Sequence, residues 1–437
     1  MRVNIFKNEE YKKINHIALP LILNNILSLI IELCDEGIMG RVSINSFAAV
    51  GIIETTVNSI TGVLGALSIA FNIIGARCKG KKDLEGLNNN FVLNVVLSCI
   101  FGVIFFILVL FGGKSVLEIF YGFTGESLKE NSNYLYIFSI SLGLNMILFM
   151  FSSYLKIIDK TKYIFYGNVI AAISNVIFDY ILVFGHVGFP KMGMIGNAIG
   201  SILALILNLV IYILVMLKFK LRLSINISIF RNFKKTIRLS IPLMGQEFLE
   251  STLIIIIVNS ILSHIGTLEV AVYNLLFLII NIALMPMYGY SQAALTLISE
   301  KLNNEDYTLN VTTKCLILAE IFYVVISLLV MIFKYKIPCV ITNDKELIKI
   351  SIKYIYIVVI CNVFYIPGTV FKHSIQSIGK EKWVFYISVI VNCITIGIIL
   401  LFTAISKMGL YGVYFGMMIG YVILSFILFM KLYKLRC

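Results

Sequence analysis

Two aspartates, Asp35 and Asp179, lie inside long apolar stretches of the N-terminal half of the chain. A carboxylate at the centre of a membrane helix costs about 2.5–3.5 kcal/mol on insertion scales, so such residues usually bind protons, cations or charged partners. The second half of the chain repeats the first and has isoleucine at the two corresponding positions, Ile257 and Ile399. Because the fold tolerates isoleucine there, the aspartates are candidates for proton or cation binding.

Two further polar residues fall at the same estimated depth as the aspartates. With a rise of about 1.5 Å per residue, Asp35 and Asp179 lie about 7 and 9 Å below the outer ends of their helices, and Ser201 lies about 10 Å below its own. Asn175 precedes Asp179 by one helical turn on the same face. This clustering on three helices predicts a cation-coupling site in the outer half of the N-terminal bundle. The alternative is that acids near helix ends contact the outer membrane interface.

Three more acids fall close to this level. Glu32 and Glu36 share a helix face with Asp35, and Glu54 lies at the same estimated depth in the next helix. Carboxylates this close repel one another, so at least one would bind a proton or a cation. Two interpretations stay open: the acids line a water-filled cavity that admits a substrate, or Glu36 and Glu54 mark frayed outer ends of helices.

The C-terminal half has one acid close to the expected midplane of the membrane. Glu250 lies about 17 Å from the cytoplasmic end of its helix, so it is a further candidate for lining a substrate cavity. Lys353 and Lys372 lie near helix ends, where long side chains extend to the interface. Pro286 and Pro367 interrupt their helices and permit bending, which occurs in static membrane helices as well as in moving ones.

The elements that must position these residues are membrane helices. The chain of 437 residues is 59% hydrophobic and 14% charged, with a mean hydropathy of +0.95. About 20 apolar residues span a bilayer as a helix, so we expect an all-α integral membrane protein with twelve spans. They lie near residues 15–39, 47–74, 91–113, 131–156, 163–185, 194–217, 239–263, 270–298, 311–333, 347–376, 382–405 and 410–430.

The two halves of the chain resemble each other in order. The segment IDKTKYIFYGNVIAAISNVIFDY at Ile158 returns as IGKEKWVFYISVIVNCITIGIIL at Ile378, and IALPL around Pro20 matches LSIPL around Pro242. Six spans per half is an even number, so both halves enter the membrane from the same side and form a parallel, pseudo-twofold repeat. We expect an N-terminal lobe at 1–217, a basic linker at 218–238 and a C-terminal lobe at 239–437.

Basic residues alternate between the two sides of the predicted spans. The segments on one side, which include both termini, carry 24 Lys and Arg, and the opposite loops carry 9. By the positive-inside rule both termini are cytoplasmic. The linker 218–238 has seven basic and no acidic residues, so we expect it to lie on anionic lipid. Nucleic-acid binding would require a soluble domain, and the sequence contains none.

The residue types that form disulfides, metal sites and catalytic dyads are scattered along the chain. The eight cysteines form no CxxC motif, and the four histidines are isolated, so the sequence supports neither a disulfide framework nor a metal cluster. No nucleophile lies beside a base in a recognisable pattern. We therefore expect a protein that is not an enzyme and has no cofactor other than a coupling ion.

Several segments resemble one family of membrane transporters. IALPLILNN, DEGIMGRV and FAAVG resemble the first two helices of multidrug and toxic compound extrusion (MATE) transporters, and SNVIFDYILVFG with GFPKMGMIGNAIGS is similar to their helices 5 and 6. The resemblance covers most of the chain. It implies twelve helices in two six-helix lobes and cation-driven export of drugs.

By position, the resemblance implies that Asp35, Asn175 and Asp179 form the site where the family binds Na⁺ or protons. Ser201 stands where a threonine is usual and keeps a hydroxyl group. Glu250, eight residues after a proline, matches a helix 7 glutamate used in some branches of the family.

The sequence also departs from the family pattern. Near Pro367, a helix 10 aspartate of the sodium-dependent norfloxacin-exporter branch is replaced, which puts coupling through that position in doubt. Glu32, Glu36 and Glu54 are not positions associated with the family, and they put the ordinary substrate range in question.

The expected function is an antiporter of the plasma membrane that exports small organic, cationic or amphipathic compounds against H⁺ or Na⁺. We expect a monomer whose partners are the substrate and the lipid bilayer. The alternative on the same general fold is a flippase for lipid-linked sugars. Phosphate headgroups would call for Arg and Lys in the cavity, whereas these spans are rich in acids.

Overall fold

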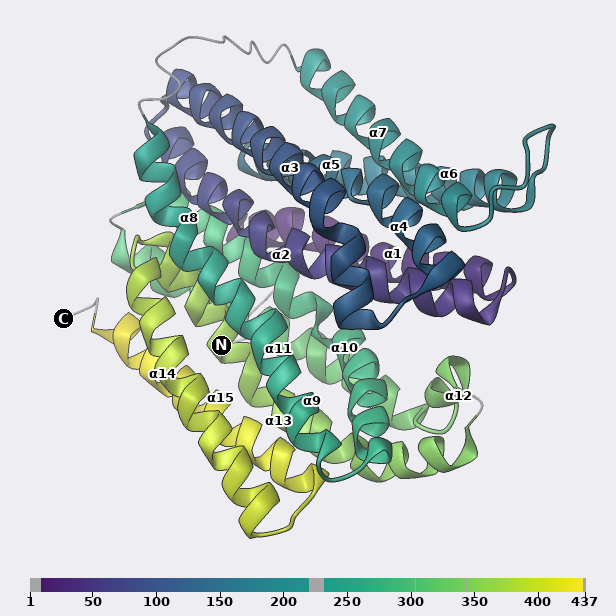
Figure 1. The fold of residues 1–437 in the computed structure, drawn as a ribbon. Coiled ribbons are helices and arrows are strands. Elements are labelled where there is room, and N and C mark those ends of the chain that lie inside the picture. The colour runs from purple at the N-terminus through teal and green to yellow at the C-terminus, as the bar shows by residue number, and fades with distance from the viewer. Residues whose placement is uncertain (1–8, 220–231, 303, 343, 435–437) are drawn as a thin grey trace. The chain divides into compact units, whose positions relative to one another are not determined.

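The computed structural model describes residues 9–219, 232–302, 304–342 and 344–434, and these residues form helices and short turns without a strand. The first half contains α1 (Glu9–Gly40), α2 (Ile44–Gly80), α3 (Leu84–Tyr121), α4 (Gly125–Phe138), α5 (Ile140–Ile157), α6 (Lys162–Phe184) and α7 (Met194–Lys218). The second half contains α8 (Phe233–Phe248), α9 (Ile254–Ser263), α10 (Thr267–Glu300), α11 (Glu305–Ile332), α12 (Ile337–Ile341), α13 (Lys345–Ser377), α14 (Glu381–Leu400) and α15 (Leu410–Tyr433) (Figure 1). The all-α fold class is confirmed.

Twelve segments of the described residues are long and apolar enough to cross a membrane, and each overlaps one predicted span. Two spans are made of more than one α-helix, and the eleventh continues from α14 into the π-helical turn Leu401–Ile405. The fourth joins α4 and α5, and the seventh joins α8 and α9 through a π-helical turn at Leu249–Leu253. The predicted count of twelve spans is therefore confirmed, while the helices extend beyond the apolar stretches.

Polar residues at the turns explain why the helices are longer than predicted. The Asp83 carboxylate accepts a hydrogen bond from the Gly86 backbone N–H at 2.7 Å, so α3 begins before its apolar stretch. Asn304 caps α11 in the same way, through the Tyr307 backbone N–H at 2.9 Å. A side-chain cap satisfies backbone donors at the first turn, so a helix can begin in the polar region.

Pro286 and Pro367 lie within the eighth and tenth spans, as the sequence predicts. Both residues lie inside continuous helices, α10 and α13. A proline removes one backbone hydrogen bond, and membrane helices tolerate this because neighbouring turns and side chains satisfy the freed groups. The irregular backbone lies elsewhere, in the π-helical turns Leu249–Leu253 and Leu401–Ile405.

Contacts divide the chain into two compact units. One comprises residues 23–240 and is called the N-terminal lobe below; the other comprises residues 1–22 with 241–437 and is called the C-terminal lobe. The long helix α1 thus contributes its first turns to one unit and the remainder to the other. Residues 220–231, most of the basic linker expected at 218–238, lie outside the described residues.

Each lobe has its own core. In the N-terminal lobe, Phe91 packs against Phe151 and Tyr154, with ring centroids 5.1 and 4.8 Å away. In the C-terminal lobe, Phe371 and Leu428 belong to a buried cluster on α13, α14 and α15. These cores hold rigid helices around the polar residues of each lobe.

Candidate functional site

Asp179 lies at the centre of a buried polar cluster in the N-terminal lobe. Its side chain is fully buried on α6, and its Oδ2 atom accepts hydrogen bonds from Asn175 Nδ2 and Asn197 Nδ2, both at 3.2 Å. Asn175 is one turn earlier on the same helix, as predicted, and Asn197 comes from α7. Asn175 Nδ2 also donates to Ser201 Oγ at 3.4 Å. The structure therefore brings Asn175, Asp179 and Ser201 together.

Two glycines of α7 allow this close approach to α6. A Cβ atom on Gly196 would lie 2.7 Å from the backbone of Leu182, and one on Gly200 would overlap Asp179 Oδ1. Small residues four positions apart let two membrane helices approach closely. The spacing of Gly196 and Gly200 thus places Asn197 and Ser201 beside Asp179.

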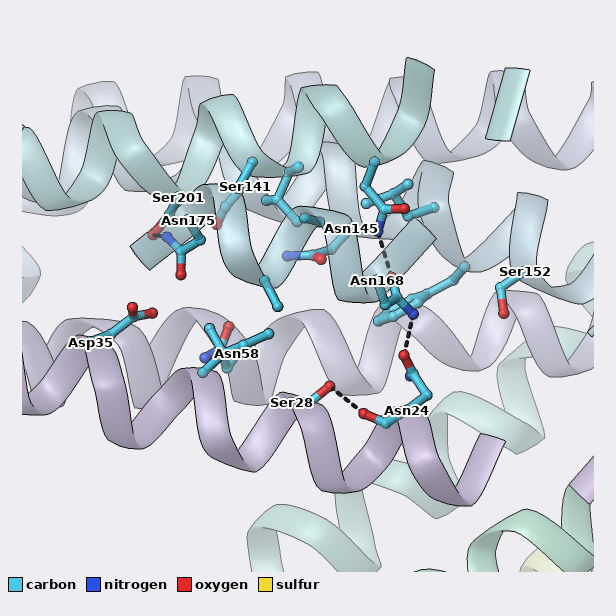
Figure 2. A pocket seen from close by; sticks show the side chains of 18 of the residues that line it. Asn24, Ser28, Asp35, Asn58, Ser141, Asn145, Ser152, Asn168, Asn175 and Ser201 are labelled. Carbon is cyan, nitrogen blue, oxygen red and sulfur yellow. Dashed lines mark hydrogen bonds between the residues drawn. The ribbon is translucent and has the colours of Figure 1, made fainter. Parts of the chain in front are cut away.

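Asp35 is the second acid of the cluster. It is 8% exposed on α1 and lies close enough to Asp179 for the two carboxyl groups to interact. Figure 2 shows Asp35 and Asn175 pointing toward one another across the cavity that they line. The side chains of Glu32 and Glu36, which were expected nearby, lie outside the described residues.

Glu54 and Tyr134 extend the cluster to two more helices. The Tyr134 hydroxyl, on α4, lies 2.6 Å from Glu54 Oε1 and 3.0 Å from Asn197 Oδ1. Glu54 lines the same cavity as Asp35, and it lies ten residues after the start of α2 at Ile44. Of the two interpretations left open for Glu54, the structure thus agrees with a position in a cavity.

The cavity of the N-terminal lobe has a volume of about 390 Å³ and a lining rich in amides and hydroxyls. Asp35 lies at one end, and Asn24, Asn168 and Ser152 lie toward the other (Figure 2). Asn168 on α6 donates to Asn24 Oδ1 on α1, and its own Oδ1 accepts a hydrogen bond from Asn208 Nδ2 on α7 at 2.5 Å. These amide pairs join α1, α6 and α7 at the end of the cavity away from Asp35.

Sequence reasoning missed Tyr134, Asn197 and the pairing of Asn24, Asn168 and Asn208. A signal existed for the asparagines, because Asn168 and Asn208 are amides flanked by apolar residues within two spans. Depth alone could not pair them, since pairing also depends on how each helix is rotated about its axis.

The C-terminal lobe has a different arrangement around Glu250. Lys372 Nζ on α13 lies 2.5 Å from Glu250 Oε2, and Gln246 Nε2 donates to Glu250 Oε1 at 2.9 Å. Gln246 is in turn fixed by Gln376 Nε2, which donates to its Oε1 at 2.8 Å. Glu250 belongs to the C-terminal lobe, whereas the cluster of Asp179 belongs to the N-terminal lobe.

The interpretation that Lys372 extends to the membrane interface is wrong. Lys372 is 6% exposed, because a buried acid of the neighbouring span provides an ion-pair partner inside the lobe. Lys353, on the same helix, is exposed as expected and lies 5.6 Å from the centroid of the Tyr354 ring.

The N-terminal cluster can bind a hard cation or a proton. Carboxylate, amide and hydroxyl oxygens are the donors that hard cations prefer, and Asp35, Asn175, Asp179 and Ser201 provide these types. No group of three or more His, Cys, Asp or Glu side chains that could hold a metal ion occurs in the part of the chain that the structure describes. The donor set thus fits a monovalent cation held partly by neutral oxygens.

The fold and the cavity define a multi-pass membrane protein with a duplicated six-span unit and an acidic cavity inside its N-terminal lobe. A single family model, MatE, matches the chain twice, at residues 20–181 and 242–403, which also supports the internal repeat. The chain therefore belongs to the MATE family of multidrug efflux transporters.

Curated relatives agree with this assignment. The chain is 24% identical over 365 residues to a probable multidrug resistance protein NorM of Thermotoga maritima, covering 80% of this chain and 78% of the relative. It is 21% identical over 437 residues to the multidrug export protein MepA of Staphylococcus haemolyticus, covering 98% and 94%.

Solved structures share the fold. An outward-facing multidrug resistance MATE family transporter of the MOP superfamily superposes with a TM-score of 0.86 at 18% identity, covering 100% of this chain and 98% of that one. A MOP superfamily transporter from Pyrococcus furiosus, described as having reversed polarity of its binding pocket, gives a TM-score of 0.84 at 19% identity, covering 100% and 98%.

Proposed function

We propose that this protein is a secondary active exporter that exchanges H⁺ or Na⁺ for organic compounds of cationic or amphipathic character. The observation that carries the proposal is the pair of interacting buried acids, Asp35, which lines the N-terminal cavity, and Asp179, which accepts a hydrogen bond from the cavity-lining Asn175. Membership of a multidrug efflux family and the names of the relatives support it.

Charge balance explains how one cavity can exchange two ligands. Two neighbouring carboxylates inside a membrane protein repel each other and are stabilised by a bound cation or proton. When Na⁺ or H⁺ enters from outside, it neutralises Asp35 or Asp179 and weakens the hold on an organic cation. The substrate then leaves outward, and the coupling ion is released on the cytoplasmic side.

The ion gradient supplies the energy of this exchange. One elementary charge that crosses a membrane potential of 100 mV is worth about 2.3 kcal/mol. Alternating access, the transport mode of many duplicated membrane folds, would expose the cavity to one side of the membrane at a time. The proposal includes a plasma-membrane location, cytoplasmic termini, a monomer, and no cofactor besides the coupling ion.

A flippase for lipid-linked sugars is the less favoured candidate. A phosphate headgroup is best bound by Arg or Lys, and the described residues that line the N-terminal cavity include neither. The lysine that lines the C-terminal cavity, Lys372, is paired with Glu250. Acid-lined cavities favour a positively charged substrate.

Efflux of a cationic dye tests the proposal. Cells that express the protein should export ethidium, and Asp35→Asn and Asp179→Asn should each reduce the rate at least about tenfold, since each removes a charge that the exchange requires. Asp306→Asn is the matched control, because Asp306 is an exposed acid in the first turn of α11. Unchanged efflux in a variant that carries both cavity substitutions would refute the proposal.

A further inference from the structure

The C-terminal lobe contains a second cavity with a different lining. Its volume is about 420 Å³, and it lies entirely among residues of that lobe. Six aromatic side chains line it: Tyr273, Phe277, Tyr288, Tyr365, Tyr414 and Tyr421. Aromatic faces attract cations at close range, most strongly where water is excluded.

The charged groups of this cavity do not cancel. Its lining includes two acids, Glu247 and Glu250, and one amine, Lys372. His373 also lines it, and the His373 Nδ1 atom lies 2.9 Å from the Thr369 carbonyl oxygen. When both acids are ionised, their two negative charges face the one ammonium of Lys372, and one further positive charge balances them.

The position of Lys372 is well defined. Its ammonium lies 2.5 Å from Glu250, and Gln246 and Gln376 form a chain of side-chain hydrogen bonds that holds the other carboxylate oxygen. Glu250 itself stands on the π-helical turn Leu249–Leu253 of the seventh span. Such turns are frequent at functional sites because they reorient a side chain.

We propose that this cavity binds an aromatic organic cation of a single charge, and that Lys372 is a built-in second cation that fixes this charge number. The positively charged group of the substrate binds beside Glu247 and the tyrosine rings, while Lys372 remains ion-paired with Glu250. The inference deepens the proposed function, on which it rests, by naming a site and the residue that sets its selectivity.

A dication is disfavoured for the same reason. Its second charge would have to displace Lys372 from Glu250, which would leave the lysine unpaired inside the protein, or approach Lys372 directly and be repelled. Replacing Lys372 with a neutral side chain frees the second carboxylate. The cavity then suits two positive charges on one ligand.

Ethidium and propidium test the inference, because they share an aromatic ring system and carry one and two positive charges. Their dissociation constants are measured on the purified full-length protein in nanodiscs. The affinity ratio is the dissociation constant of ethidium divided by that of propidium. Relative to the wild type, Lys372→Met should shift this ratio in favour of propidium by about tenfold or more. Lys372→Arg, which keeps the charge, should retain the wild-type ratio.

Two further variants separate charge from folding. Lys353→Met removes an exposed lysine from the same helix and should leave the ratio unchanged. The double variant Lys372→Met, Glu250→Gln returns the cavity to one uncompensated carboxylate and should restore the wild-type preference. Recovery in the double variant would show that charge balance sets the ratio.

The outcomes distinguish this inference from the proposed function. If Lys372→Met leaves the ratio unchanged while the wild type still exports ethidium against an ion gradient, the inference is wrong and the exporter stands. If the wild type neither binds nor exports either dye, the proposed class of substrate is wrong as well. A shift of the ratio by Lys353→Met would also overturn the role given to Lys372.

Discussion

Gly200→Ala should change the proton dependence of transport although it changes no charge. A methyl group at this position would overlap Asp179 Oδ1 and would lie 3.2 Å from the Asp179 backbone nitrogen. The side chain is the movable partner, so the carboxyl group must turn away by about an ångström to restore ordinary contact. Its Oδ2 atom would then lose the geometry of its bonds to Asn175 and Asn197, both 3.2 Å long.

The size of the effect follows from these two hydrogen bonds. A hydrogen bond to a charged group contributes about 1.5–3 kcal/mol, and bonds of this length fall at the lower end. Both bonds stabilise the ionised carboxylate, so losing one costs that form about 1.5 kcal/mol, which corresponds to about a tenfold gain in its affinity for a proton. The helix itself should not suffer, because alanine is favoured over glycine in a helix interior by about 0.8–1.0 kcal/mol.

The assay is dye efflux from proteoliposomes as the coupling ion is titrated. Where H⁺ is the coupling ion, Gly200→Ala should lower the H⁺ concentration for half-maximal efflux about tenfold. Gly397→Ala is the control, since a Cβ at Gly397 meets nothing within 4 Å. In an Asp179→Ala background, adding Gly200→Ala should have little further effect. Wild-type ion dependence in Gly200→Ala would refute the role assigned to Asp179.

Two more substitutions test the surroundings of the acids. Tyr134→Phe removes the hydroxyl that contacts Glu54 and Asn197, so efflux should fall several-fold while thermal stability changes little; equal efflux would contradict a role for this hydroxyl. Asn168→Leu leaves the amide of Asn24 without its donor, so thermal unfolding should occur several degrees lower; an unchanged Tm would show that the amide pairs do not stabilise the lobe.

The twelve spans and their pairing into two halves could be predicted from the sequence because hydrophobicity and repetition are local properties. The same is true of depth along a helix, which predicted Asp179 and Ser201 at one level and Asn175 one turn beneath Asp179. The structure brings these three residues together. Residues that approach one another at one depth on adjacent spans can thus be found without coordinates.

Rotation about the helix axis could not be predicted in the same way. These helices are apolar on most faces, so hydrophobic patterning does not say which face meets which neighbour. Tyr134 was missed because its importance depends on contacts with Glu54 and Asn197, 80 and 63 residues away in the chain. Such contacts arise from helix packing.

Lys372 shows a second limit of sequence reasoning. Its place near a helix end favoured an interfacial side chain, yet its partner Glu250 lies 122 residues away on another span. A buried ion pair can satisfy a lysine as well as water does, and only the packing of the two helices reveals it. The helices α10 and α13 likewise continue through their prolines.

The most direct test of the central claim is ethidium transport by proteoliposomes in which either a pH gradient or a Na⁺ gradient is imposed alone. The account predicts that one of the two gradients drives transport in the wild type and that neither drives it in Asp179→Asn. Transport by the wild type at the same rate with and without both gradients, or full gradient-driven transport by Asp179→Asn, would contradict the account.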